Sequence, residues 1–430
     1  MDYTVTVDHD DILRARKVLL ASGRRTTREE ADAYRILARV NPAAYLPRLV
    51  SSLHQLSYDR LYDTRHQTRL ALLEEAVAAA RAIDPAEPAR PDVLYRALDA
   101  YQGQLYTLGR RAEGLAVRAE MVAVGREQAA ASGDRAVKGL SVWAAGLCEE
   151  GRYSEAADAL TEWVAAIRPK GSRSGAFAWS LLEWVGALDA AGRSGEALAA
   201  FEELVRLEAA DVATDRGPMA CHLYTLIRYA QMLDIRGRRG EATVVRHEAL
   251  ALLTELAATG ERKSWSGYQA TYWAVLLSLS GSDSEWPVAS SEPHPPLGAT
   301  PMDWSPGVRQ RYFSECDDLT EELRDLEARA TEDPWRHLPE LIRVHRALTI
   351  RSAVYWEKRT HLFADEARHL FDEGVDLARR LYEHNTGEGA AILATALTDR
   401  STFRTACKEF EAALDDFRQA LEVLGTPGIS

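Results

Sequence analysis

The sequence contains little cysteine, and this limits the classes of protein it can encode. Its four cysteines lie far apart and form no CxxC pair: Cys148, Cys221, Cys316 and Cys407. Disulfide frameworks and cysteine-based zinc sites need closely spaced cysteines. The spacing therefore argues against a disulfide-rich secreted domain, and we expect reduced thiols in a cytoplasmic protein.

Long apolar runs are also missing. No stretch approaches the roughly 18 apolar residues that a membrane span needs, and 27% of the residues are charged. The first residues, Met1 to Val7, lack the basic region and apolar core of a signal peptide. We therefore expect neither a membrane span nor a secretion signal.

Positive charge is in deficit. The chain has 52 Lys and Arg against 65 Asp and Glu, which gives a formal net charge of -13. Binding to a nucleic acid backbone needs clustered cations that neutralise phosphates. The charge balance therefore argues against nucleic acid as the main partner.

Catalytic motifs are missing as well. The sequence has no HExxH, no GxSxG and no Gly-rich phosphate loop. His337 and His345 are eight residues apart, as are His361 and His369, which is too far along a helix for one metal ion. We predict no catalytic residue, no cofactor and no metal, and we expect a protein that is not an enzyme. An enzyme with a site built from scattered residues is the least favoured alternative.

A short glycine-containing turn is present and recurs. It reads Gly151-Arg-Tyr-Ser-Glu-Ala156, with further copies at Gly192 and Gly237 and a weaker one at Gly109. Glycine after a helix readily takes the left-handed conformation that ends the helix. We expect Ser154 and Ser194 to act as N-caps of the next helix, and the turn's alanine to let two helices approach closely.

The turn recurs at a nearly fixed period. Gly109, Gly151, Gly192, Gly237 and Gly281 stand 42, 41, 45 and 44 residues apart. A leucine stands four residues before each: Leu105, Leu147, Leu188, Leu233 and Leu277. Apolar residues elsewhere follow the helical period, and no segment has the alternation of a strand. The pattern predicts repeated pairs of helices.

These offsets resemble those of the tetratricopeptide repeat (TPR) family. Tyr153, Ala156, Phe201 and Ala249 fit the family's positions, although the family period is about 34 residues. The resemblance implies an all-α fold, a right-handed superhelical solenoid of antiparallel helix pairs. Similar lengthened arrays occur in bacterial regulators beside a nucleotide-driven switch, but this chain has no GxxxxGK[ST] of its own.

Three regions follow from the pattern. Residues 1–281 are expected to form an N-terminal TPR-like array, and residues 307–430 to continue the solenoid as C-terminal helical repeats. Residues 282–306 contain six prolines with serine and glycine between them, so they form a flexible insertion or a linker. We favour an insertion, with 307–330 as the second helix of the repeat whose first helix ends at Gly281.

The family resemblance also implies a binding groove lined by the first helices of successive pairs. Register from each glycine places these residues in the groove: Arg96, Asp99, Lys138, Trp179, Glu183, Tyr224, Arg228, Tyr268 and Tyr272. Aromatic and charged residues are typical of recognition surfaces, although Trp179 and Tyr268 could equally pack between helices. We expect an adaptor or scaffold that holds a peptide or partner protein in this groove. The alternative is a regulator whose groove senses a small effector or peptide, and a homodimer is compatible with both.

Overall fold

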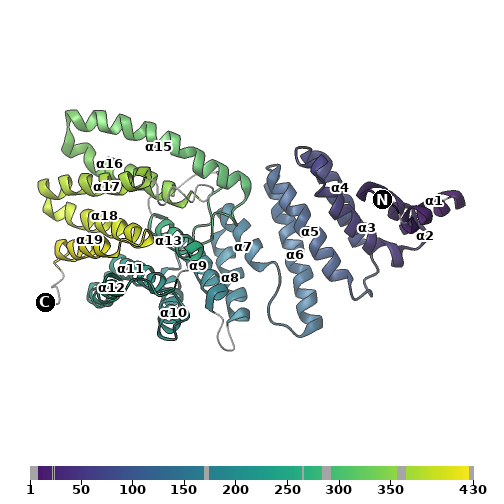
Figure 1. The fold of residues 1–430 in the computed structure, drawn as a ribbon, viewed down its shortest axis with the longest axis horizontal. Coiled ribbons are helices and arrows are strands. Elements are labelled where there is room, and N and C mark those ends of the chain that lie inside the picture. The colour runs from purple at the N-terminus through teal and green to yellow at the C-terminus, as the bar shows by residue number, and fades with distance from the viewer. Residues whose placement is uncertain are drawn as a thin grey trace. The chain divides into compact units, whose positions relative to one another are not determined.

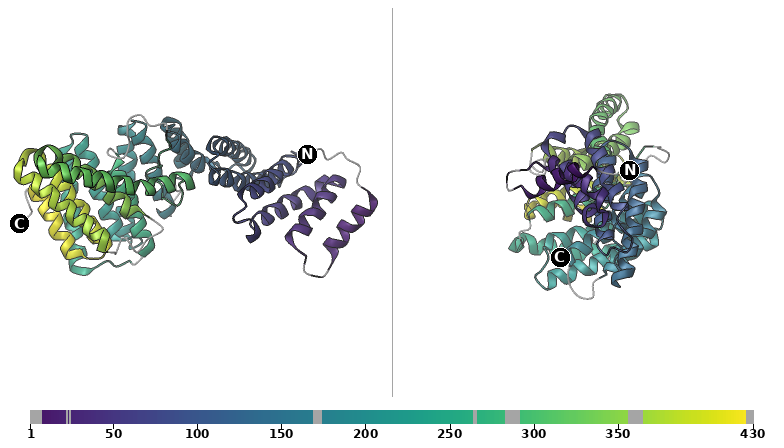
Figure 2. Two further views of the ribbon diagram at one scale, coloured as in Figure 1. Left: turned by 90° about the horizontal axis from the view of Figure 1, so that it is seen from above. Right: turned by 90° about the vertical axis from the view of Figure 1, so that its right-hand side faces the viewer.

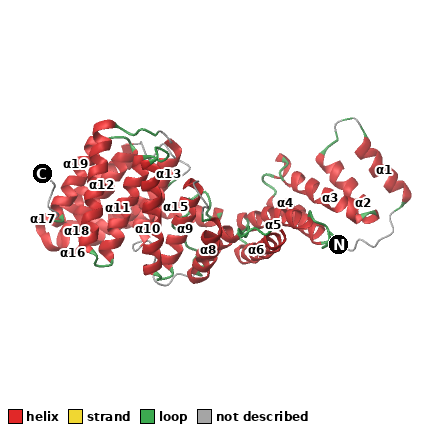
Figure 3. Cartoon of the chain, turned by 90° about the horizontal axis from the view of Figure 1, so that it is seen from below, coloured by secondary structure: helices red, strands yellow, loops and turns green. Residues whose placement is uncertain are grey.

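The computed structural model describes residues 8–21, 23, 25–168, 174–263, 266–282, 292–355 and 365–425. The elements in these ranges are α-helices and one 3-10 helix, η1 (Arg60–Tyr62), with no strand among them (Figure 3). The all-α prediction is therefore confirmed. The helices are α1 (His9–Leu20), α2 (Thr27–Val40), α3 (Pro42–Ser57), α4 (His66–Arg81), α5 (Arg90–Thr107), α6 (Arg111–Ser132), α7 (Leu140–Glu149), α8 (Tyr153–Ile167), α9 (Ser174–Ala190), α10 (Ser194–Ala213), α11 (Met219–Ile235), α12 (Arg239–Thr259), α13 (Ser266–Ser280), α15 (Pro306–Glu332), α16 (Pro334–Val354), α17 (Asp365–His384), α18 (Thr386–Ala406) and α19 (Phe410–Val423).

Contacts between residues divide the chain into two compact units. The N-terminal unit comprises Met1–Leu147, Ala165–Ile167 and Ser305–Gly307, and the C-terminal unit comprises Cys148–Val164, Arg168–Trp304 and Val308–Ser430. The main division thus falls near residue 147. The helices on both sides of residues 282–306 belong mainly to the C-terminal unit.

The recurring glycine turn has the predicted backbone. Gly109, Gly151, Gly192 and Gly237 have φ angles of 70° to 73°, which is the left-handed region that glycine enters at little cost. The alanine that closes each full copy is completely buried at positions 156, 197 and 242. A larger side chain there would separate the two helices of the pair.

The predicted serine caps are wrong. Ser154 and Ser194 lie inside the helices, and the N-cap residues are the arginines that follow each glycine, without a side-chain cap hydrogen bond. Each arginine instead forms a two-pronged ion pair with the glutamate three residues later: Arg110–Glu113, Arg152–Glu155, Arg193–Glu196 and Arg238–Glu241. The glutamate keeps its charge near the positive helix end, and the arginine fixes its position.

The N-terminal unit is a sequential stack. Each of helices α1 to α5 packs against the next one in the chain, and one apolar core runs from α2 to α6. The capping box at the start of α2 uses Thr26 and Glu29. Neighbouring-helix packing of this kind is what a helical repeat array requires.

The C-terminal unit contains long-range packing in addition to sequential stacking. The core formed by α11 and α12 includes Ala413, Leu414, Phe417 and Leu421 of α19. Helix α19 therefore lies against α12 (Figure 1), and a view from above shows the same neighbourhood (Figure 2). In a simple solenoid each repeat contacts only its neighbours. The last hairpin instead returns to an earlier one.

Helices α13 and α15 do not form the predicted hairpin in this packing. Leu323, Leu326 and Ala330 of α15 share a core with α16 and α17. Helix α13 packs on α11, α16 and α18, where Trp273 contacts Phe371 and Phe403. Helix α15, which was expected to pair with α13, thus packs with α16 and α17 instead.

Part of the proline-rich stretch is packed rather than flexible. Residues 292–304 are described, and Leu297, Ala299 and Trp304 in them are buried. The carbonyl oxygen of Leu297 lies over α9, where a Cβ atom added to Gly186 would meet it at 2.0 Å. Residues 283–291, the rest of the predicted insertion before this segment, lie outside the described residues. We call residues 292–304 the strap.

The last hairpin uses the same turn without glycine. Helix α18 continues to Ala406 and α19 begins at Phe410. Lys408 has a φ of 64° and occupies the place that glycine fills in the other turns. Asp416 of α19 is buried and accepts hydrogen bonds from Arg400 at 2.7 and 3.0 Å, which ties α19 to α18.

Candidate functional site

The first three predicted groove residues gather in the N-terminal unit. Arg96 and Asp99 are exposed on α5, and Arg96 donates a hydrogen bond to the carbonyl of Asp92. The Nζ of Lys138 lies 3.3 Å from the carboxylate of the same Asp92. Arg96 and Lys138 thus both contact Asp92, and Arg96, Asp99 and Lys138 are all exposed.

Residues of α3 and α4 extend this surface. The imidazole of His54 stacks edge-on against Tyr58, with 5.0 Å between the ring centroids, and the guanidinium of Arg69 lies 4.5 Å from the Tyr58 ring. Burial lowers the pKa of His54, and the positive charges of Arg96 and Arg69 lower it further. His54 is therefore neutral at pH 7. We call His54, Tyr58, Arg69, Arg96, Asp99 and Lys138 the docking face.

The docking face has the composition of a recognition surface. Tyr58 is 55% exposed, although it is a large aromatic residue. Three of the six residues are cations, against one carboxylate within the set. Asp92, which pairs with Lys138, brings the carboxylates of this surface to two, so one positive charge remains in surplus in a chain whose net charge is -13.

The equivalent positions of the C-terminal unit are filled by the chain itself. Tyr224 is 2% exposed and Tyr272 is 0% exposed. Trp179 meets the ring of Tyr272 edge-on at 5.7 Å, so it packs between helices, as the alternative interpretation had it. Tyr268 belongs to α13, and its side chain lies outside the described residues. The aromatic residues expected in an open groove here form an interior.

Glu183 lies under the strap. Gly298 passes so close that an added Cβ would be 2.4 Å from the carbonyl oxygen of Leu182 and 3.4 Å from the Cα of Glu183. Burial raises the pKa of Glu183 to about 8, and the negative charge of Asp303 in the strap adds to the shift. The carboxyl group predicted to face a ligand is therefore largely protonated at neutral pH and covered by the chain.

A second buried carboxyl group lies between α10, α11 and α13. Burial raises the pKa of Glu208 to about 7, the nearby Asp211 raises it further, and a hydrogen bond with Tyr272 opposes the shift. The hydroxyl groups of Tyr272 and Thr225 are 2.9 Å apart. This polar network fixes α13 on α11.

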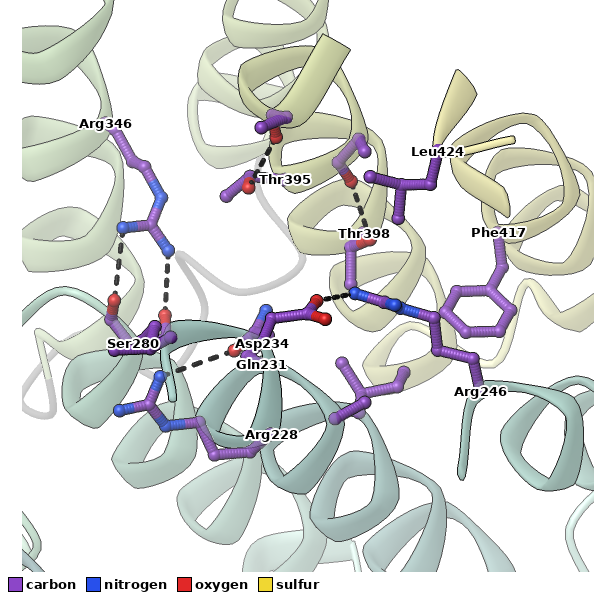
Figure 4. A pocket seen from close by; sticks show the side chains of 15 residues that line it. Arg228, Gln231, Asp234, Arg246, Ser280, Arg346, Thr395, Thr398, Phe417 and Leu424 are labelled. Atoms are coloured by element: carbon purple, nitrogen blue, oxygen red, sulfur yellow. Dashed lines mark hydrogen bonds and ion pairs between the residues drawn. The ribbon is translucent and has the colours of Figure 1, made fainter. Parts of the chain in front are cut away.

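Arg228, the remaining predicted residue, lines a cavity of about 330 Å³ (Figure 4). Its guanidinium donates to the carbonyl of Leu279 at 2.8 Å. Arg346 reaches the same region from α16 and donates to the hydroxyl of Ser280 at 2.8 Å and to Asp399 at 2.8 Å. The cavity is closed on the side of α19 by Phe417 and Leu424.

A second cavity of about 270 Å³ adjoins the first. The two share Arg346, Ala391 and Thr395 in their linings. The second is mainly apolar on the side of α16 to α18, where Ile342, Leu370, Phe371, Ile392 and Ala396 line it. Arg346 thus lines both cavities, and the second cavity is the more apolar of the two.

Sequence reasoning missed several residues of both surfaces. His54, Tyr58 and Arg69 lie in the chain before the helix that ends at Gly109. Counting back from the period glycines therefore could not identify them. Arg346 and Ser280 are far apart in the sequence, and no local sequence pattern predicts that they contact each other. The Arg-x-x-Glu spacing after each glycine was visible in the sequence and could have revealed the turn ion pairs.

The described residues contain no cluster of three or more His, Cys, Asp or Glu side chains suited to a metal ion. The thiol of Cys148 is buried, and burial followed by the charges of Glu183 and Glu149 raises its pKa to about 12. It is therefore a poor nucleophile. Within the described ranges, no helix combines the length and the apolar character of a membrane span.

Comparison with known proteins finds TPR-like repeats among solved structures. No protein-family model and no curated protein matches the chain. Among solved structures, kinesin light chain TPR-like repeats of Podosopora anserina are 20% identical, with 50% of this chain and 98% of that chain covered and a TM-score of 0.38. BtubC (BKLC) of P. vanneervenii is 14% identical over 57% of this chain and 92% of its own, with a TM-score of 0.39. The TPR domain of P58(IPK) is 12% identical, with 87% of this chain and 92% of that chain covered and a TM-score of 0.21.

The fold is a TPR-like array of helix hairpins. The left-handed glycine turns, the buried alanines after them and the stacking of successive helices show this directly in the chain's own structure.

Proposed function

We propose that the chain is a non-enzymatic interaction scaffold that binds an acidic segment of a partner protein on the docking face. The observation that carries the proposal is the exposure of Tyr58 beside Arg69 of α4, with Arg96 on α5 and Lys138 in the turn before α7. The packed helices hold these side chains at fixed spacing, so little conformational entropy is lost on this side of the complex.

The cations and the Tyr58 ring of the docking face make different contributions to binding. Arg69, Arg96 and Lys138 attract carboxylates and speed the encounter, an effect that salt weakens. The Tyr58 ring offers apolar area and a polar edge, as aromatic anchors do at interfaces. The partner segment therefore carries at least two acidic residues and an apolar or aromatic side chain between them.

The test uses the full-length protein and a random peptide library displayed on phage. We expect enrichment of Asp and Glu in the selected peptides. Binding of a selected peptide, measured by fluorescence anisotropy, should weaken about tenfold for Arg96→Glu and for Lys138→Glu, since one charge-assisted contact is worth roughly that much. It should also weaken for Tyr58→Ala.

Arg28→Glu is the matched control, because Arg28 is an exposed arginine on α2 outside the docking face. The same charge reversal there should leave the affinity unchanged. A library without acidic binders, or equal affinity of the Arg96→Glu and Arg28→Glu variants, would contradict the proposal.

The sensor alternative has a specific observation of its own. The arginine-lined cavity of the C-terminal unit is a place for a small effector, and α19, which closes it, is the helix that returns to α12. Binding there would act on the packing of the C-terminal unit rather than on the docking face.

A further inference from the structure

We propose that the strap is an internal occupant of a binding site on α9, and that a partner protein displaces it with a segment of the same kind. In that segment two prolines are followed by an aliphatic residue and a glycine. The strap has this order itself, in residues 295–298. The inference does not depend on the docking face, because it concerns other residues in the other unit.

The middle of the strap is inserted among side chains and helices. Residues 295–299 are all buried, and Leu297 is 4% exposed. Glu292 at one end and Met302 near the other are exposed. Proline-rich segments suit such insertion, because their backbone is largely fixed beforehand and loses little entropy on binding. The buried middle is therefore the part that the site recognises.

The strap makes a turn where it crosses α9. The amide N–H of Ala299 donates to the carbonyl oxygen of Pro296 at 3.1 Å, and Gly298 between them has a φ of 99°. This conformation favours glycine. A Cβ atom added to Gly298 would also lie 2.4 Å from the carbonyl oxygen of Leu182 in α9. The site therefore requires glycine at this position of the segment that fills it.

Helix α9 leaves room for a passing backbone. A Cβ atom added to Gly186 would lie 2.0 Å from the carbonyl oxygen of Leu297 and 3.4 Å from the side chain of Leu279 in α13. Glycine inside a helix lowers its stability relative to alanine. The space that Gly186 leaves for the strap is the physical reason for a glycine at this place.

The end of α7 binds the residue before the two prolines. The amide N–H of His294 donates to the carbonyl oxygen of Glu149 at 3.1 Å, and Glu149 is the last residue of α7. The last carbonyl groups of a helix have no partner within it. Because proline has no N–H group, the two prolines that follow His294 could not make this bond. A bound segment thus pairs with α7 through the residue that precedes its prolines.

The strap lies against a helix position whose counterpart in the N-terminal unit is open. Leu182 stands ten residues before Gly192, as Asp99 stands ten residues before Gly109. Asp99 is exposed to solvent, whereas the backbone at Leu182 is approached closely by Gly298. The chain thus fills on α9 a position that it leaves free on α5.

The ends of the strap are held by the helix that follows it. The ring of Trp304 meets that of Tyr312 in α15 edge-on, with 5.1 Å between the centroids. Arg311 of the same helix binds the carboxylate of Glu292 and the carbonyl oxygen of Pro293. Helix α15 itself shares a core with α16 and α17. The middle of the strap can therefore leave α9 while its ends stay attached.

The test opens the site and offers the strap as a separate peptide. In the opened variant, residues 294–301 are replaced by glycine and serine in equal number, which keeps both anchored ends. A labelled peptide of residues 292–304 should bind this variant in fluorescence anisotropy. The intact protein should bind it at least about tenfold more weakly, because a tethered strap competes at an effective concentration in the mM range. Equal affinities, or no binding to the opened variant, would overturn the inference.

Substitutions in the peptide and in α9 locate the contact. Gly298→Ala in the peptide should weaken binding to the opened variant at least about tenfold, whereas Met302→Ala, at a residue that is 53% exposed in the strap, should leave it unchanged. Gly186→Ala in the opened variant should weaken binding as well. Gly195→Ala is its matched control, since nothing lies within 4 Å of an added Cβ there. Equal effects within either pair would contradict the site.

Displacement is tested on the intact protein. The peptide at mM concentration should speed proteolytic cleavage within residues 294–301, and the Gly298→Ala peptide should not. A strap that stays protected would show that it is a fixed part of the fold, and the inference would be wrong. If circular dichroism shows that the opened variant does not fold, a peptide with a photoreactive side chain in place of Leu297 is crosslinked to the intact protein. Labels away from α9 and α13 would then overturn the assignment.

Discussion

The same helix positions have opposite surroundings in the two units. Arg96 and Asp99 of the N-terminal unit face solvent, beside an exposed Tyr58. Tyr224, which stands thirteen residues before its glycine as Arg96 does, is buried among helices of the C-terminal unit, and so is Tyr272. The difference shows that repeat register selects a face of a helix, while the rest of the chain decides whether that face is free.

The covering of the C-terminal unit comes from two segments. The strap lies on α9 at Gly186, and α18 and α19 return to α11 and α12. Both burials remove apolar area from water. The exposed face of the N-terminal unit has no comparable covering segment among its described residues.

The largest expected difference between the units is in the cost of removing a tyrosine. Tyr272→Ala should destabilise the C-terminal unit by roughly 3–5 kcal/mol, because a fully buried aromatic ring leaves a cavity. Tyr58→Ala should stay within about 0.5 kcal/mol. Urea unfolding followed by tryptophan fluorescence measures the first, since nine of the ten tryptophans belong to the C-terminal unit; circular dichroism follows both. Equal costs would contradict the comparison.

Displacing the strap should have the next largest effect. In Gly186→Ala the new methyl group would meet the backbone oxygen of Leu297, and we expect a loss of roughly 1–3 kcal/mol together with faster proteolysis within 292–304. Gly195→Ala is the control, because Gly195 is also helical and nothing lies within 4 Å of an added Cβ. Limited proteolysis with mass spectrometry measures the cutting. Unchanged cleavage in Gly186→Ala would show that the strap does not cover α9.

The covered face should also respond to pH in a way that the open one does not. Glu183 and Glu208 have pKa values of about 8 and about 7 in the folded chain, above the roughly 4.3 of an unfolded glutamate. The folded state therefore binds more protons between these values, and stability falls as pH rises from about 4.5 to about 8.

Glu208→Gln and Glu183→Gln should each remove part of this slope, because glutamine carries no titrating proton. Each should stabilise the protein at pH 8 by roughly 1–3 kcal/mol relative to its effect at pH 5. Unfolding free energies at both pH values test this. Glu113→Gln, in an exposed turn of the N-terminal unit, is the control and should leave the slope between these pH values unchanged.

The smallest predicted effect concerns the turn that lacks glycine. Lys408→Gly should stabilise the last hairpin by about 0.5–1 kcal/mol, since lysine is strained at a left-handed φ and glycine is not. Gly192→Ala should change stability in the opposite direction by a similar or larger amount. Thermal unfolding of the two variants gives the comparison, and a destabilised Lys408→Gly protein would contradict it.

Much of the local structure could be predicted from the sequence. Four of the period glycines take the left-handed conformation, and Ala156, Ala197 and Ala242 are buried as expected. These features depend on residues close together in the chain. Lys408 escaped detection because the same backbone turn can be formed by a residue that gives no glycine signal.

The closing of the C-terminal unit could not be predicted in this way. Phe417 packs against α11 and α12, which are far away in the sequence. Neither segment has a sequence pattern that predicts which helix it packs against. The groove prediction placed Arg228 and Tyr272 on an open face, and it did not identify the helices that cover them. The cavity beside Arg228 exists only because of that covering.

Hydroxyl-radical footprinting of the full-length protein, read by mass spectrometry, tests the central comparison most directly. Oxidation of each tyrosine reports how much water reaches its ring in solution. We predict rapid oxidation of Tyr58 and strong protection of Tyr224 and Tyr272. Oxidation of Tyr224 and Tyr272 at the rate of Tyr58 would contradict the account, because the face of the C-terminal unit would then be as open as that of the N-terminal unit.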